Sequence, residues 1–216
     1  MSGWQVGAQV WLRRADGDSL HEAEQTCGPF VLAEVVDPGD GQDGPVEVRR
    51  VGSQVSQSCA PGALAARNGE TQPDNALLMS LSQASLLENI LRRYQEGGSP
   101  YTYTGGILTS VNPCKAVPEL YSAATMTSYA GRLLGGNQPP HLYAMAEESY
   151  RLLVRSRSHQ GMVVSGVSGA GKTVGLIDQP WPQPLAAHPS PHAPRPRPPP
   201  PCSPYPRPSL SLRHPF

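Results

Sequence analysis

Gly166-Val167-Ser168-Gly169-Ala170-Gly171-Lys172-Thr173 is the stretch on which the interpretation of this chain rests. It fits the pattern of a phosphate-binding loop, in which a glycine, four residues and Gly-Lys-Thr follow one another. The glycines let the backbone curl so that successive N–H groups face phosphate oxygens. Lys172 would reach the outer phosphates, and the Thr173 hydroxyl would bind Mg²⁺. The stretch therefore predicts a site for a nucleoside triphosphate with Mg²⁺.

The segment before this loop fits a phosphate-binding site, and the segment after it does not. Met162-Val163-Val164-Ser165 is short, apolar and β-branched, which predicts a buried strand leading into the loop. After the loop, Val174-Gly175 and then Pro180 leave room for little more than one helical turn, although such a loop normally opens a helix. The alternative is a glycine-rich turn that happens to contain a lysine. Against it, both lysines of the chain, Lys115 and Lys172, lie in nucleotide-type motifs.

Composition excludes several classes of protein. Seventeen basic and 17 acidic residues give a formal net charge of +0, so electrostatics favours neither nucleic acid nor a membrane surface as partner. No apolar run is long enough for a membrane span, and the N-terminus lacks the pattern of a secretory signal. The 4 cysteines are far apart and have no metal-ligand spacing, which favours reduced thiols in the cytosol. We therefore expect a cytoplasmic protein.

Residues 1–58 are rich in β-strand signals. Apolar and polar residues alternate over 6–12, and 30–36 and 46–51 are two further short β-leaning runs. Strands at this spacing predict a small SH3-like β-barrel, and the alternative is an irregular β-rich arm with no core of its own. Residues 59–73 are small and polar and predict a linker.

A clear helical pattern follows the expected linker. Ser85 and Glu88 have the spacing of a capping box, apolar residues recur at helical spacing up to Tyr94, and Gly97-Gly98 ends the pattern. The apolar face is expected to be buried. The opposite face, expected to be exposed, carries Glu88, Asn89, Arg92 and Arg93.

Shorter elements fill the segment up to the phosphate loop. A hairpin of two strands is predicted over 101–111, with Gly105-Gly106 as its turn. A loop bounded by prolines occupies 112–121, and a weak helix follows over 122–129. A stronger helix is expected to open at Pro139-Pro140, with proline in its first turn.

Four stretches follow one another in a recognisable order: LLENILRRY at 86–94, YTYTG with the later VNP at 101–113, PPHLYA at 139–144 and VVSGVSGAGKT at 163–173. This order resembles the start of a myosin motor domain of an unconventional class. The resemblance implies an α/β fold over 74–175, as part of a P-loop NTPase myosin motor. The β-rich N-terminus is similar to the SH3-like subdomain that precedes many myosin motors.

The resemblance also implies the residues of an ATP site. Asn112, Pro113 and Tyr121 would line the purine, with Lys115 near it, and Thr173 would bind the metal. A tyrosine ring offers a flat apolar face, and an asparagine offers a donor and an acceptor. Without the resemblance, Tyr121 would be interpreted as a packing aromatic at a helix start. The phosphates would be held by Gly166, Val167, Ser168, Gly169, Ala170, Gly171, Lys172 and Thr173.

Two departures from the family pattern limit what the resemblance implies. The family has Glu where this chain has Val167, and Glu after the threonine where this chain has Val174. From Val174 onward the resemblance stops, so switch regions, relay helix, actin-binding cleft and lever arm are not found. Phosphoryl transfer needs several such parts. We therefore expect a truncated, cytoskeleton-associated relative that binds ATP and Mg²⁺ without hydrolysis, with actin filaments as partner only by resemblance.

Residues 176–216 form a Pro/Arg-rich tail without an acidic residue after Asp178. Such a composition predicts disorder with some polyproline II. The segment 195–201 fits the Arg-x-x-Pro-x-x-Pro ligand of SH3 domains, although almost any Arg/Pro-rich tail contains such a match. A second hypothesis is therefore a non-enzymatic interaction protein that uses the SH3-like module and the tail. The abrupt change at Val174 also suggests an alternatively spliced product.

Overall fold

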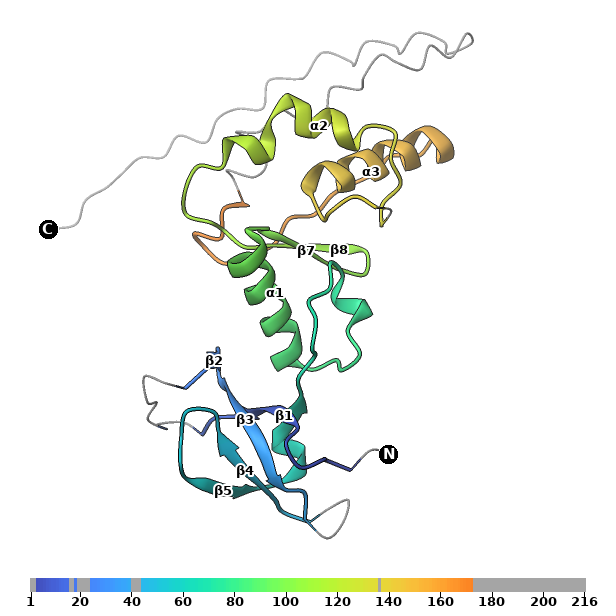
Figure 1. Cartoon of the computed structure of the whole chain (residues 1–216). Helices are drawn as coiled ribbons and strands as arrows, with labels where there is room; N and C mark the ends of the chain where they lie inside the picture. Colours follow the sequence, from blue (N-terminus) through green and yellow to red (C-terminus); the bar gives the residue numbers. More distant parts are fainter. Residues whose placement is uncertain (1–2, 16–17, 19–23, 40–43, 136, 173–216) are drawn as a thin grey trace, which may run out of the picture. The chain divides into compact units, whose positions relative to one another are not determined.

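The computed structural model describes residues 3–15, 18, 24–39, 44–135 and 137–172 (Figure 1). The chain divides into two units, 1–184 and 185–216, and every described residue belongs to the first. Three expectations lie outside the described residues: the role of Thr173, the disorder of 176–216 and the SH3 ligand at 195–201. Within the described ranges, every helix is too short or too polar to cross a membrane.

Six strands form one sheet in the N-terminal part of the chain. They are β1 (Gln9–Arg13), β2 (Thr26–Cys27), β3 (Phe30–Asp37), β4 (Val46–Arg50), β5 (Ser56–Cys59) and β6 (Leu64–Ala66). The order is β5-β4-β3-β1-β6, with β2 also paired to β3, and every pair is antiparallel. Strands are confirmed in the three expected regions, while the SH3-like barrel stays a prediction. The segment 59–73, expected as a linker, supplies β6 and so joins the sheet.

The two central strands of this sheet, β1 and β3, are largely buried on both faces. Alternate residues of the two central strands sort into two apolar clusters, as the period of two in a strand requires. Val10 and Val31 belong to the first cluster, whereas Trp11 and Leu32 belong to the second. The second cluster also contains Ala84, so the helix α1 (Gln83–Gly97) packs against the sheet.

The N-cap of helix α1 lies three residues before the expected cap, Ser85. Ser82 is its N-cap: the Ser82 Oγ accepts from the Ser85 N–H at 3.1 Å, and the Ser85 Oγ accepts from the Ser82 N–H at 2.8 Å. The expected Ser85–Glu88 capping box is therefore wrong, because Glu88 lies inside the helix. The end is confirmed: Gly98 takes a left-handed φ of 61°, and its N–H donates to the Arg93 carbonyl.

The buried face of α1 is partly polar. Glu88 and Asn89, expected to face away, are only 4% and 3% exposed, so that expectation is wrong. The Asn89 amide pairs with both backbone groups of Gln72, at 2.8 and 2.9 Å, and donates to Asn75 Oδ1 at 2.7 Å. These partners replace the water that a buried amide would lose. Leu87, expected to be buried, is 41% exposed.

The remaining strands and α-helices follow the expected order, and the described residues also form three short 3₁₀ helices that were not predicted. These elements are η1 (Pro61–Ala63), η2 (Asn75–Leu77), β7 (Tyr101–Thr104), β8 (Ile107–Ser110), η3 (Pro118–Tyr121), α2 (Ala123–Tyr129) and α3 (Leu142–Ser156). The hairpin β7–β8 is confirmed, with Gly105 at a φ of 59° in its turn. The helix α3 is confirmed as well, but its N-cap is His141, so both prolines precede the helix.

The expected buried strand at 162–165 is not formed. Val163 is 94% exposed and Val164 is 44% exposed, and the segment belongs to no sheet of the described part of the chain. A strand needs a hydrogen-bonded neighbour, and none lies beside this segment among those residues. The second half of α3 is similarly uncovered, with Leu153 at 40% and Val154 at 59% exposure.

Candidate nucleotide-binding site

The loop after β8 touches the glycine-rich loop. Asn112 Nδ2 donates to the Gly169 carbonyl at 2.9 Å. The Asn112 Oδ1 accepts from the Cys114 N–H at 2.9 Å, and Cys114 takes a φ of 51°. Both ends of the Asn112 amide are thus used within the protein. The two loops that the sequence predicted separately are therefore in contact, and Asn112 is the residue that joins them.

Gly171 allows this close approach. Its φ is 85°, and a Cβ placed on it would lie 3.3 Å from Asn112 Cγ. A side chain there would be strained in its backbone and would also press on the Asn112 amide. At the other end of the loop, a Cβ on Gly166 would lie 3.1 Å from the Ala170 Cβ. The glycine pattern therefore has a steric reason at two of its positions.

Lys172 folds back onto its own loop. Its Nζ donates to the carbonyls of Gly166 and Val167 at 2.7 and 2.8 Å. The Ala170 N–H closes the loop further by donating to the Val167 carbonyl at 3.2 Å. An ammonium group has three donors, so one N–H of Lys172 remains for a phosphate oxygen. The side chain of Val167, where the family has a carboxylate, is exposed, as is that of Ser168.

Tyr121 lies at the far end of the 112–121 loop. Its hydroxyl oxygen is 2.6 Å from that of Tyr101, and its carbonyl accepts from the Tyr143 hydroxyl at 3.1 Å. Tyr121 therefore packs against Tyr101 and Tyr143. A packing aromatic is what the sequence predicted for it when the family resemblance was set aside. Pro113 is half-buried and Lys115 is exposed in the same loop. The contacts of Tyr121, Pro113 and Lys115 with a purine stay predictions.

His141 connects this loop end to α3, a role that the sequence did not predict. The imidazole is 2% exposed: its Nδ1 accepts from the Tyr143 N–H and its Nε2 donates to the Leu120 carbonyl, both at 3.0 Å. Burial lowers its pKa to about 4, against the opposing effect of the Leu120 bond. The ring is therefore neutral at pH 7. It is surrounded by Tyr101, Tyr121, Tyr129 and Tyr143.

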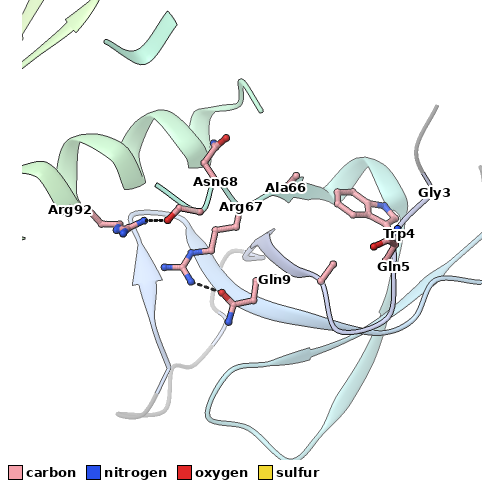
Figure 2. Close-up of a pocket in the computed structure, with 10 residues that line it drawn as sticks. Gly3, Trp4, Gln5, Gln9, Ala66, Arg67, Asn68 and Arg92 are labelled. Carbon is pink, nitrogen blue, oxygen red and sulfur yellow. Dashed lines mark hydrogen bonds between the residues drawn. The ribbon is translucent and has the colours of Figure 1, made fainter. Parts of the chain in front are cut away.

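A separate cavity of about 710 Å³ lies beside the N-terminal sheet (Figure 2). Trp4 and Gln9 line it together with Arg67 and Arg92, and no residue of the two loops takes part. Both arginines already have carboxylate partners. The cavity is therefore distinct from the candidate nucleotide site.

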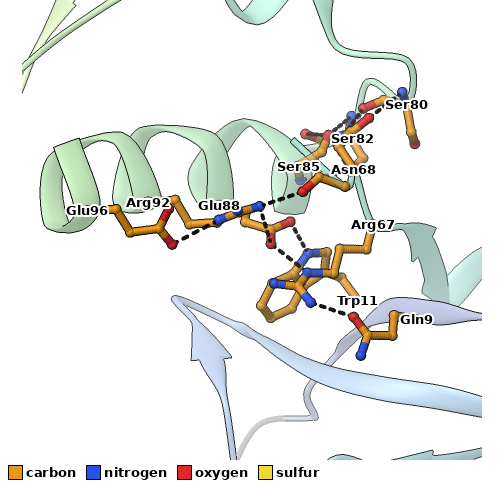
Figure 3. A network of polar contacts seen from close by, with 11 residues as sticks. Gln9, Trp11, Arg67, Asn68, Ser80, Ser82, Ser85, Glu88, Arg92 and Glu96 are labelled. Carbon is orange, nitrogen blue, oxygen red and sulfur yellow. Dashed lines mark hydrogen bonds and ion pairs between the residues drawn. The ribbon is translucent and has the colours of Figure 1, made fainter. Parts of the chain in front are cut away.

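Glu88 fastens α1 to the sheet (Figure 3). Its carboxylate accepts from Trp11 Nε1 at 2.8 Å and from Arg67 Nε at 2.7 Å, and Arg92 lies 3.9 Å away. Arg92 also pairs with the exposed Glu96 at 3.1 Å. The buried carboxylate is thereby satisfied by Trp11 of β1 and by Arg67, the residue after β6, and these bonds hold α1 against the sheet.

The described ranges contain no group of three or more His, Cys, Asp or Glu side chains that could hold a metal ion. Thr173, the expected protein ligand, lies outside the described residues.

Comparison with known proteins gives a family for this site. Residues 72–176 match the family model of the myosin head (motor domain). Unconventional myosin-VI of Sus scrofa is 45% identical over 100 residues, which is 46% of this chain and 8% of that protein. Unconventional myosin-Vc of Homo sapiens is 41% identical over 101 residues, 47% of this chain and 6% of that protein. Myosin-7 of Arabidopsis thaliana is 36% identical over 164 residues, 70% of this chain and 9% of that protein.

The chain thus spans less than a tenth of the length of these relatives. The match contains both loops of the candidate site, and Asn112 and Gly169, which join them, lie within it. The chain therefore carries an N-terminal stretch of a myosin motor domain, and its residues 72–176 belong to the myosin head family.

Proposed function

We propose that this chain binds ATP with Mg²⁺ across the two touching loops, as a myosin-like, cytoskeleton-associated protein. The observation that carries the proposal is the hydrogen bond from Asn112 to the Gly169 carbonyl. A glycine-rich turn that matched the pattern by chance would not be expected to contact the loop to which the family resemblance assigns the purine. Actin as a partner rests on that resemblance alone.

Each loop has a proposed task. The backbone N–H groups of 166–172 hold the phosphates, and the free N–H of Lys172 binds an outer phosphate oxygen. Thr173 and the phosphates hold Mg²⁺, which neutralises phosphate charge. The purine lies against the 112–121 loop, next to Asn112, Pro113, Lys115 and Tyr121. These residues bind and orient the nucleotide.

We do not expect these 216 residues to hydrolyse ATP by themselves. Phosphoryl transfer requires a residue that positions the attacking water and further groups around Mg²⁺. The resemblance ends near Thr173 without supplying them. We propose that the chain by itself binds ATP and releases no phosphate. The interaction-protein alternative has no observation in its favour, because the 195–201 segment lies outside the described residues.

The test is titration of the purified chain with fluorescent ATP and Mg²⁺, comparing the parent with Lys172→Ala. A charge-assisted hydrogen bond contributes about 1.5–3 kcal/mol, so Lys172→Ala should weaken binding at least about tenfold. Arg132→Ala removes an exposed cation elsewhere and should leave the affinity unchanged. No saturable binding by the parent, or equal binding by parent and Lys172→Ala, would overturn the proposal.

A further inference from the structure

The loop 112–121 is held at both of its ends. At its start, Asn112 bonds to the Gly169 carbonyl of the glycine-rich loop. At its end, two successive carbonyls are bound: that of Leu120 by His141 Nε2, and that of Tyr121 by the Tyr143 hydroxyl. Asn112 belongs to the nucleotide site already described, whereas His141 has no role in it so far.

We propose that His141 is a positioning residue of the nucleotide site, which holds the 112–121 loop in place for the purine through the Leu120 carbonyl. The inference rests on the proposed function and adds a specific consequence to it. His141 should matter for the base of the nucleotide, because the loop that it holds faces the base. It should not matter for the phosphates, which the glycine-rich loop holds.

The geometry gives the imidazole two distinct tasks. Its Nδ1 caps α3 by accepting from the Tyr143 N–H, and its Nε2 holds the loop by donating to the Leu120 carbonyl. Only the neutral ring with its proton on Nε2 performs both. A protonated ring carries hydrogen on both nitrogens and would lose the bond from the Tyr143 N–H.

The surroundings keep the ring neutral. The titratable groups placed against the ring are tyrosines: Tyr101 from β7, Tyr121 from η3, Tyr129 from α2 and Tyr143 from α3. Tyr103, also from β7, contacts the backbone of His141. None of these offers a negative charge to a protonated imidazole at neutral pH. The ring is also buried, so protonation would lack solvation.

Two substitutions separate the tasks. In His141→Asn the short amide oxygen takes the place of Nδ1 and keeps the helix cap, because asparagine is a favoured N-cap, but it cannot reach Leu120. In His141→Gln the longer amide can place its nitrogen near the position of Nε2 and restore the bond to Leu120. The comparison of the two variants therefore tests the bond to Leu120. Circular dichroism melts check that both variants keep the fold.

The experiment measures displacement of fluorescent ATP by ATP and by inorganic tripolyphosphate, with Mg²⁺ present. For His141→Asn we expect ATP to bind up to about tenfold more weakly, as the loss of one hydrogen bond predicts. Tripolyphosphate should bind as to the parent, within about twofold, because it occupies only the glycine-rich loop. For His141→Gln, ATP affinity should return to within about threefold of the parent.

A second readout needs no nucleotide. Cys114 is an exposed thiol inside the loop, and its rate of alkylation can be followed by mass spectrometry of its peptide. Burial raises the pKa of Cys27 to about 11 and also raises that of Cys59, so these thiols serve as slow internal references. Releasing the loop should speed alkylation of Cys114 several-fold in His141→Asn and not in His141→Gln.

The outcomes separate the two proposals. If the parent binds no ATP, the proposed function fails and the inference fails with it. If the parent binds ATP and His141→Asn binds ATP equally well, with unchanged Cys114 alkylation, only the positioning role is overturned. An equal loss of ATP and tripolyphosphate binding in His141→Asn would show a general structural role and would also overturn it.

Discussion

Asn112 and Gly169 are 57 residues apart in the sequence, and the Asn112 Nδ2 lies 2.9 Å from the Gly169 carbonyl oxygen. The same amide stabilises its own loop through the Cys114 N–H. A single side chain thus sets the distance between the loop expected to hold a purine and the loop expected to hold phosphates. Changes at this contact should alter nucleotide binding more than they alter the fold.

Asn112→Ala should weaken binding of fluorescent ATP by up to about tenfold, because one exposed hydrogen bond contributes about 0.5–1.5 kcal/mol. The fold should be retained, since Asn112 is exposed. Asn137→Ala, at another exposed asparagine, is the matched control and should bind like the parent. Parent-like affinity in Asn112→Ala would contradict the joining role.

Gly171→Ala should reduce ATP binding through the Asn112 contact as well as through backbone strain. Gly171 and Gly135 both have positive φ, 85° and 74°, so alanine at either position carries a similar strain of about 1 kcal/mol. Only at Gly171 would the new Cβ press on Asn112, because the space around Gly135 is open within 4 Å. Equal loss of ATP binding in the two variants would show that strain alone acts.

Glu88→Ala should destabilise the chain by about 3–5 kcal/mol, because it leaves the Trp11 indole N–H and Arg67 without their buried acceptor. Glu96 is the other carboxylate partner of Arg92, and its side chain is 63% exposed. Glu96→Ala should therefore change the free energy of unfolding by less than about 0.5 kcal/mol. Urea unfolding followed by circular dichroism measures both. Similar midpoints for the two variants would contradict the fastening role of Glu88.

Acid should destabilise the fold through His141. Its pKa is lowered from 6.5 to about 4, so the unfolded chain takes up a proton below pH 6.5 that the folded chain refuses until pH 4. Stability should therefore fall as the pH drops from 6.5 to 4, by up to about 3 kcal/mol, with no contribution from this group above pH 6.5. The difference from His141→Asn isolates the effect, and His159→Asn, at an exposed histidine, should keep the parent profile.

Val163→Lys should raise the solubility of the chain. Val163 is 94% exposed beside Met162 and Val164, and exposed apolar segments without a strand partner promote association. Val55→Lys, at a residue 73% exposed and apart from this segment, should raise solubility less. The readout is the soluble concentration after centrifugation, and an equal gain in both variants would show an effect of net charge only.

Local patterns predicted much of the fold. Alternation over 6–12 located β1, short β-leaning runs located β3 and β4, Gly105-Gly106 located the hairpin turn, and Gly98 ended α1. The cap of α1 was misplaced because Ser85 and Glu88 have capping-box spacing, while Trp11 and Arg67, far away in sequence, recruit the Glu88 side chain. The segment at 162–165 has strand composition, but strand formation depends on a neighbour.

The sequence predicted the two loops of the candidate site, but it did not predict the contact between them. Spacing found the glycine-rich loop, and the resemblance found the loop beginning at Asn112. The contact between them depends on tertiary structure and on the close approach that Gly171 permits. His141 was missed because histidine is not a favoured N-cap. Its position directly before Leu142, the first residue of α3, was the signal that could have revealed it.

The Trp11–Glu88 hydrogen bond spans 77 residues, which has a consequence for the order of folding during synthesis. Synthesis adds about 5–20 residues per second, so Trp11 leaves the ribosome several seconds before Glu88. For several seconds the sheet can assemble only with the indole N–H bound to water. The closing of this large loop, and with it the docking of α1, must then be a late step in folding.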